Sequence, residues 1–292
     1  MLNKQEYDPE NVVVIYHGPC NDGFTAAWAA WMRFGEKARY YQTNHGKPPP
    51  SGLKGKDVFI LDFSYPKEIV KEIEKQANSL VILDHHLTAL NELSGFDCFV
   101  FDMKRSGCGL AWDYFHGNPR PNLVVHVEDQ DLWNFDYNHT REIMAVIETT
   151  EKTFENWNDL FLSLEDDAKY QNIAKQGRTM IDYRNHIVRE RFVKKPTYIY
   201  LDNNIVPAAN STIWQSEIGA ALSRNNDSFA AVWFQLSDGR FKISLRSDKR
   251  MGMDVSKVAQ KYGGGGHKNA ASFITEHVPQ IVDWEEVDIE MR

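Results

Sequence analysis

The stretch Leu80-Val81-Ile82-Leu83-Asp84-His85-His86 decides the fold. Four apolar residues followed by polar ones predict a strand that is covered on both faces, as in a parallel sheet. Open α/β sheets place their ligands at the carboxyl ends of such strands. The carboxylate and the two imidazoles after this strand are therefore candidate cation ligands, although alone they fit a solvated turn equally well.

Two further apolar strands end in a residue that can bind metal. Val13-Val14-Ile15-Tyr16 runs into His17, and Val58-Phe59-Ile60-Leu61 runs into Asp62. Three strands that each end this way are hard to attribute to chance. The pattern favours a metal site at the carboxyl edge of a parallel sheet.

The order of the expected elements predicts an α/β protein. Apolar strands alternate with helical segments in the first half, which is typical of a parallel sheet with helices on both faces. Residues 151–195 are polar and helical in pattern, and a smaller α/β domain follows. The boundaries that we predict are 1–170 for the first domain, 171–196 for a helical connector and 197–292 for the second domain. The strands expected in the first domain are 11–16, 38–42, 57–62, 80–84 and 96–101, and those in the second are 197–201, 229–236 and 240–245.

Length and composition restrict the class of protein. The 292 residues exceed what one core needs, which makes two domains the default. No apolar run approaches the roughly 18 residues of a membrane span. The polar N-terminus and three unpatterned cysteines predict a cytoplasmic protein without a disulfide framework. The sequence leaves a monomer and a homodimer both open.

The charge pattern restricts the partners. The formal net charge is −8, and the densest basic clusters, 184–195 and 240–250, are short. A protein that grips long nucleic acid usually carries a basic stripe that neutralises many phosphates. We therefore expect no long duplex as a partner and favour small anionic substrates.

The motifs resemble those of the DHH phosphoesterase superfamily. His17, Asp22-Gly23, Asp62 and Asp84-His85-His86 follow that family's order, and 243–247 with 262–271 are similar to its C-terminal DHH-associated domain. The resemblance implies a metal-binding DHH domain followed by a substrate-binding domain. It also implies two metal ions, with Mn²⁺ as first choice and Mg²⁺ as second.

The resemblance also implies ligands. His17 and Asp62 would hold one ion, and Asp22, Asp62, His85 and Asp129 the other. Asp129 is chosen because it follows an apolar stretch, with Glu128 and Asp131 close by. Asp84 would orient a ligand and His86 would meet the phosphate.

The first motif departs from the family pattern at Cys20. The family usually has an aspartate there, two residues ahead of Asp22. A thiolate could bind an ion, but we expect a neutral thiol that packs beneath the loop.

The second domain carries residues suited to phosphate. The run Gly263 to Gly266 is either a flexible linker or a loop whose N–H groups approach an anion, and its position before His267 favours the second. Gly264, Gly265, Gly266 and His267 are therefore expected to bind substrate. Arg246, at the end of a strand, offers a guanidinium for a second phosphate.

The sequence thus predicts a metal-dependent phosphodiesterase. Short oligonucleotides or small nucleotides would be hydrolysed to mononucleotides by metal-activated water, in a cleft between the two domains. The alternatives are a hydrolase of pyrophosphate or polyphosphate and a weakened nucleotide-binding sensor. The tryptophans in apolar settings are expected in the core rather than as stacking platforms; they are Trp28, Trp31, Trp112, Trp133 and Trp233.

Overall fold

The computed structural model describes residues 6–224, 229–248, 250, 253–277 and 279–282. The chain divides into two compact units, Met1–Ile181 and Asp182–Arg292. The division falls within the segment 171–196, which the sequence predicts as a connector. A 22-residue helix, α8 (Asp167–Val188), runs through this division, and a π-helical turn (Arg189–Val193) follows it.

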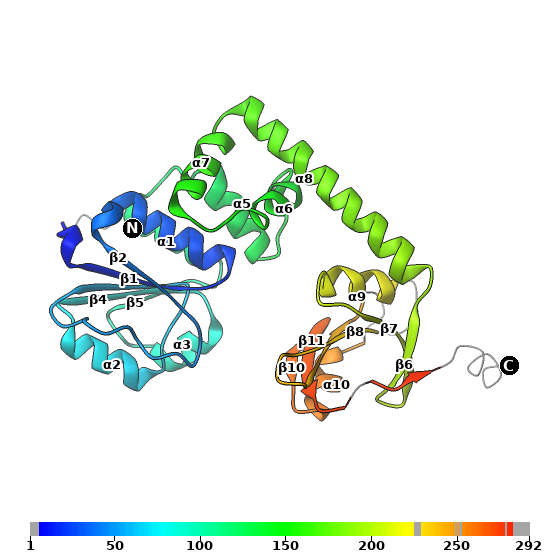
Figure 1. The fold of residues 1–292 in the computed structure, drawn as a ribbon. Coiled ribbons are helices and arrows are strands. Elements are labelled where there is room, and N and C mark those ends of the chain that lie inside the picture. The colour runs from blue at the N-terminus through cyan, green and yellow to red at the C-terminus, as the bar shows by residue number, and fades with distance from the viewer. Residues whose placement is uncertain (1–5, 225–228, 249, 251–252, 278, 283–292) are drawn as a thin grey trace. The chain divides into compact units, whose positions relative to one another are not determined.

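The first unit is built on a five-stranded sheet in the order β2-β1-β3-β4-β5 (Figure 1). All four neighbouring pairs are parallel, as expected. The strands are β1 (Val12–His17), β2 (Arg39–Thr43), β3 (Asp57–Leu61), β4 (Ser79–Asp84) and β5 (Phe99–Phe101). The carboxyl ends of β1, β3 and β4 therefore meet at one edge of the sheet.

Both faces of this sheet are buried. Side chains alternate along each strand, so neighbouring residues of one strand pack in different core clusters. Val12 and Val14 of β1 pack in one core cluster with α1, whereas Val13 and Ile15 pack in a second cluster with α2. Helix α1 lies on one face, and α2 and α3 lie on the other (Figure 1). This two-sided burial accounts for the unbroken apolar runs in the sequence.

The helices of the first unit include two that the sequence pattern did not predict, α3 and α6. Helix α1 begins at Asn21, where the Cys20 thiol accepts a hydrogen bond from the Gly23 N–H and caps the helix. The helices are α1 (Asn21–Phe34), α2 (Lys67–Gln76), α3 (Leu87–Leu93), α4 (Gly107–Phe115), α5 (Asn122–Asp131), α6 (Thr140–Ile147) and α7 (Phe154–Leu164).

The second unit is a seven-stranded mixed sheet in the order β10-β11-β9-β8-β7-β6-β12. Among the described strands of this sheet, only β7 and β8 are parallel neighbours. Apolar residues of α9 and α10 pack in separate core clusters of this unit. The elements are β6 (Thr197–Leu201), β7 (Asn204–Asn210), α9 (Gln215–Arg224), β8 (Ala230–Gln235), β9 (Phe241–Arg246), α10 (Val255–Lys261), β10 (Gly265–His267), β11 (Ala270–Thr275) and β12 (Ile281–Val282).

The tryptophans are not all in the core. Trp28 and Trp112 are buried, and Trp31 and Trp233 are half-buried against core residues. Trp133 is wrongly predicted as core, because 66% of it is exposed. It has a left-handed backbone, with φ of 58°, in the turn after α5.

The described helices include none with the length and apolar character needed to cross a bilayer.

Candidate metal centre and phosphate pocket

Asp62 lies at the centre of the carboxyl edge of the first sheet. Its Oδ2 is 3.4 Å from His17 Nδ1, and its Oδ1 is 3.2 Å from His85 Nε2. The residue has a left-handed backbone, with φ of 56°, and its N–H donates to the Leu83 carbonyl at 2.9 Å. The two carboxylate oxygens thus face residues from two different strand ends.

Asp22 is positioned by the start of helix α4. The N–H groups of Gly107 and Cys108 donate to its two oxygens at 2.7 and 2.8 Å. Its Oδ2 also lies 3.7 Å from His85 Nε2. Ser106 caps α4 by accepting from the Gly109 N–H, so it supports this geometry from behind.

The three acidic residues of α5 have three different surroundings. Glu128 pairs with Arg105 and Arg120. Asp129 is buried and accepts hydrogen bonds from the N–H groups of residues 136 and 137 and from the Thr140 hydroxyl. Asp131 reaches toward His85, with its Oδ2 3.6 Å from Nε2.

The structure therefore does not bring Asp129 to the cluster that the resemblance implied. Both of its carboxylate oxygens accept hydrogen bonds from the segment that follows α5, so Asp129 fixes the position of that segment. Asp131, two residues later, is the member of α5 that shares a potential metal-binding group with Asp22 and His85. No pattern in the sequence distinguishes Asp131 from Glu128 and Asp129, because the position of His85 in space selects it.

Asp84 fixes the turn after β4. Its Oδ1 contacts His86 Nδ1 at 2.7 Å and accepts from the His85 N–H at the same distance, while Ser64 donates to its Oδ2 at 2.6 Å. Asp84 is 1% exposed, whereas 41% of the His86 side chain is exposed. The His86 ring is thus oriented from the buried side, and its Nε2 has no hydrogen-bond partner among the residues that the structure describes.

The electrostatics of the cluster show an excess of negative charge. Burial and the neighbouring carboxylates of Asp62 and Asp131 raise the pKa of Asp22 well above its usual range. Burial opposes protonation of His85, but the contact with Asp62 and the charge of Asp22 outweigh it and raise the His85 pKa to about 9. Burial likewise opposes ionisation of Asp62, but the contacts with His17 and His85 hold its pKa below its usual range. A protein that keeps three carboxylates this close gains stability from a cation.

The donor atoms also have the arrangement that a cation needs. Asp62 Oδ1 is buried and accepts no hydrogen bond, which is costly unless another partner satisfies it. The described residues include three groups of possible ligands, and within each group the donor atoms lie within 4.8 Å of one another. They are His17 with Cys20 and Asp62, Asp62 with His85 and His86, and Asp22 with His85 and Asp131. These residues fit divalent metal ions.

The second unit contains a polar pocket of about 220 Å³ that includes several of the residues expected to bind substrate. Lys242, Ser244 and Arg246 occupy alternate positions of β9 and so line one face of the sheet. The Arg246 guanidinium donates to Ser216 and to the Leu245 carbonyl, each at 2.8 Å, which holds it in place. The sequence analysis missed Lys242, although its alternation with Arg246 is visible in the sequence.

The glycine run is part of the sheet. Gly265, Gly266 and His267 form β10, which pairs with β11. Gly265 and Gly266 line the pocket, whereas Gly264 donates its N–H to the Ala259 carbonyl and His267 is exposed outside the pocket lining. A Cβ on Gly266 would come within 2.6 Å of the Ala270 carbonyl oxygen, so close strand pairing requires glycine there.

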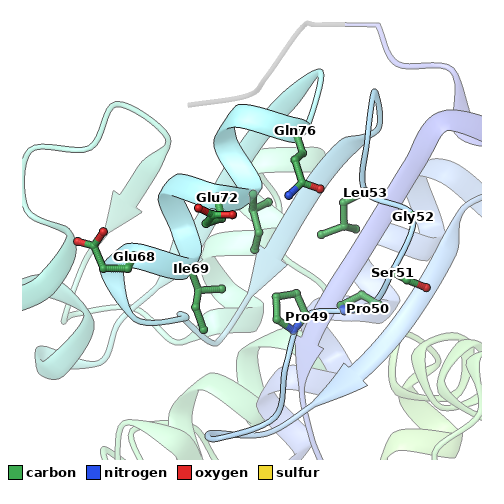
Figure 2. A pocket seen from close by; sticks show the side chains of 10 residues that line it. Pro49, Pro50, Ser51, Gly52, Leu53, Glu68, Ile69, Glu72 and Gln76 are labelled. Carbon is green, nitrogen blue, oxygen red and sulfur yellow. The ribbon is translucent and has the colours of Figure 1, made fainter.

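A larger pocket, of about 430 Å³, lies elsewhere in the first unit (Figure 2). It is formed by residues 49–53 and one side of α2, and it contains none of the expected site residues. Glu68 and Glu72 contribute carboxylates, and none of its lining residues is basic. Its chemistry does not suit a phosphate.

Several known proteins are similar in sequence to this chain. Residues 200–285 match the model of the DHHA1 domain. An uncharacterized protein of Acanthamoeba polyphaga mimivirus, R106, is 30% identical over 99% of this chain and 72% of its own length. Oligoribonuclease NrnB of Bacillus subtilis is 23% identical over 77% of this chain and 61% of its own length. The chain belongs to the DHH superfamily of phosphoesterases.

A solved structure of a phosphodiesterase shares the fold. The pGpG-specific phosphodiesterase PggH of Vibrio cholerae aligns over 96% of both chains with a TM-score of 0.53 and 14% identity. The two-unit α/β architecture is therefore that of the superfamily, as expected. As a DHH protein the chain is a hydrolytic phosphoesterase.

Proposed function

We propose that this DHH protein is a metal-dependent phosphodiesterase that hydrolyses short oligonucleotides or small nucleotides to mononucleotides. The observation that carries the proposal is the position of Asp62, whose Oδ2 faces His17 while its Oδ1 faces His85. A carboxylate between two donor groups is suited to bridging two ions.

The donor groups divide between two ions. His17 and Asp62 would hold the first ion, and Asp22, Asp62, His85 and Asp131 the second, with Asp131 in the place first expected of Asp129. The second group contains only carboxylate and imidazole donors, which suits Mn²⁺, or Mg²⁺ as second choice. Bound divalent ions lower the pKa of water and offset negative charge on a phosphoryl group.

His86 would contact the scissile phosphate. Its Nδ1 is bound to Asp84, and this hydrogen bond raises the pKa of the imidazole. The protonated ring would donate from Nε2 to a phosphate oxygen, while Asp84 keeps the ring from rotating. Asp84 thus acts through His86 and not on the substrate.

The pocket of the second unit would hold the rest of the substrate. Lys242 and Arg246 provide two positive charges at its wall, and Ser244 and Ser272 provide hydroxyls. These groups suit a terminal phosphate or a nucleotide. The printed names of two relatives concern short oligonucleotides, since one is an oligoribonuclease and the other is specific for pGpG. The net charge of −8 also favours a short substrate over a long duplex.

The test compares the wild type with Asp62→Ala and Asp62→Asn on a substrate panel with Mn²⁺. The panel contains labelled di- to decanucleotides, pAp, cyclic dinucleotides, pyrophosphate and polyphosphate. We expect mononucleotide release from the shortest oligonucleotides, and a loss of several orders of magnitude in both folded variants. Preferential hydrolysis of polyphosphate would replace the proposal with a phosphoanhydride hydrolase. Binding of nucleotides without turnover would replace it with a sensor.

A further inference from the structure

The first donor group contains a thiol at short range. Cys20 Sγ lies 3.6 Å from His17 Nδ1 and 3.4 Å from Asp62 Oδ2, and those two atoms are themselves 3.4 Å apart. The three donors thus form a nearly equilateral triangle. The sequence led us to expect a thiol that only packs beneath the loop. In the structure the thiol also donates a hydrogen bond to Asp62 Oδ2, and an ion at this position would replace the shared proton.

The edges of this triangle match one face of a tetrahedral metal site. Zinc bonds of about 2.3 Å to sulfur and 2.0–2.1 Å to nitrogen or oxygen, at tetrahedral angles, separate donors by about 3.5–3.6 Å with sulfur and about 3.3–3.4 Å without it. The right angles of an octahedral ion with bonds of about 2.1 Å would need only about 3.0 Å between nitrogen and oxygen donors. The three observed edges, 3.6, 3.4 and 3.4 Å, all lie within about 0.2 Å of the tetrahedral values.

A second observation at the same place is independent of the thiol. Asp62 is 2% exposed, and its Oδ1 accepts no hydrogen bond. The carboxylate that completes the triangle with Oδ2 is therefore only half satisfied by the protein. This Oδ1 faces His85 Nε2 at 3.2 Å, so an ion of the second donor group would be its partner, and Oδ2 is left for an ion held with His17 and Cys20.

Burial and the Asp62 carboxylate raise the pKa of the Cys20 thiol above its usual range, and one backbone contact opposes them. Cys20 is the N-cap of α1, and the Gly23 N–H donates to its sulfur at 3.2 Å. The N-terminus of a 14-residue helix favours negative charge at this position. Gly23 allows the approach, because a Cβ on it would come within 2.1 Å of the His17 carbonyl oxygen.

We propose that Cys20 is a metal ligand and that His17, Cys20 and Asp62 form a three-donor site for a thiophilic divalent ion such as Zn²⁺. The inference rests on the proposed function, and it makes the two ion sites chemically unequal. Binding converts the thiol to a thiolate, and its proton passes to solvent. Three protein donors would leave one position of a tetrahedral ion for water or substrate.

The test is a Co²⁺ titration of the full-length, metal-free protein, monitored by absorption spectroscopy. Thiolate-to-Co²⁺ charge transfer gives a near-ultraviolet band, whereas the visible d–d bands report bound Co²⁺ with any ligands. We expect the charge-transfer band in the wild type and in Cys98→Ser, a half-buried cysteine outside the cluster. Cys20→Ser keeps a capping oxygen for Gly23, so it should fold, retain d–d bands from the second group and lose the charge-transfer band.

Metal competition provides the second arm. Cys20→Asp replaces a soft donor with a hard one, and the preference for Cd²⁺ over Mn²⁺ should fall by roughly tenfold or more. The wild type could show visible d–d bands and hydrolyse nucleotides but lack the charge-transfer band. That result would overturn the role of Cys20 without affecting the proposed phosphodiesterase activity. A wild type with neither Co²⁺ binding nor hydrolysis would overturn the proposed function and this inference together.

Discussion

Gly107 lies so close to Asp62 that a Cβ on the glycine would come within 2.3 Å of the Asp62 Cβ. The N–H of the same glycine donates to Asp22. One residue at the start of α4 thus sets the positions of two carboxylates from different parts of the first unit. The absence of a side chain at 107 is therefore what the cluster requires.

Gly107→Ala should therefore damage the metal cluster. The added methyl displaces Asp62 or the start of α4, which should cost about 1–3 kcal/mol of stability and lower kcat by roughly 100-fold. Gly109→Ala is the matched control, since its Cβ would meet Glu128 and Arg105 instead. Thermal unfolding should show lower stability in both variants. Metal titration should show weaker binding only in Gly107→Ala. Unchanged metal affinity in Gly107→Ala would show that the contact does not position Asp62.

Asp131 and Asp129 should separate metal binding from stability. Asp131→Asn should weaken metal binding and turnover with little change in unfolding free energy, because its side chain is 32% exposed. Asp129→Asn should lower the unfolding free energy by about 1–3 kcal/mol, since its buried oxygens hold the following loop. Calorimetric metal titration and denaturant unfolding measure the two effects. The reverse pattern would restore Asp129 as the ligand.

Arg246→Ala should affect large substrates more than small ones. If the guanidinium holds a remote phosphate, kcat/KM for dinucleotides should fall by the roughly 1.5–3 kcal/mol of a charge-assisted contact. Hydrolysis of bis-p-nitrophenyl phosphate should change little, because that ester has no group for the second unit to bind. Arg240→Ala, an exposed arginine paired with Asp238, is the control. Equal losses on both substrates would rule out a separate binding role for Arg246.

His126 should make the fold sensitive to acid. Its ring lies between Thr140 and Tyr170, and burial lowers its pKa from 6.5 to about 4. Between those pH values the unfolded chain binds a proton that the folded chain does not. The contribution of His126 to unfolding free energy should thus decline by about 1.4 kcal/mol per unit as pH falls from about 6.5 to about 4. Denaturant unfolding of His126→Gln should show a shallower decline over this range, and parallel curves would contradict the assignment.

The sheet of the first unit was predictable because its strands are buried on both faces. Val13 to His17 and Val58 to Asp62 show this as unbroken apolar runs with polar ends, and the same ends supply much of the cluster. Strand β7 gave no such signal. Pro207 interrupts it, and proline normally argues against an internal strand. In the structure Pro207 pairs with Tyr198 of β6, and pairing with β8 begins only at Ala208.

The α5 residue that reaches the cluster was not predictable in the same way. A strand end identifies its residue by position, but a helix presents neighbouring acids in different directions. Asp129 follows the apolar stretch and therefore faces the interior, where the loop uses both of its oxygens. Only the position of His85 in space selects Asp131. The orphan Oδ1 of Asp62 likewise has no signature in the sequence.

The separation of tasks along α5 has an evolutionary consequence. Asp129 maintains the fold, whereas Asp131 faces the cluster from a partly exposed position. If Asp131 binds the metal as we propose, a lineage that loses it would keep its folded protein and with it the polar pocket of the second unit. Such a descendant would pass from hydrolysis to recognition in one mutational step, without an unstable intermediate for selection to remove. The reverse step is equally short, which makes this helix a place where a family of hydrolases can give rise to receptors.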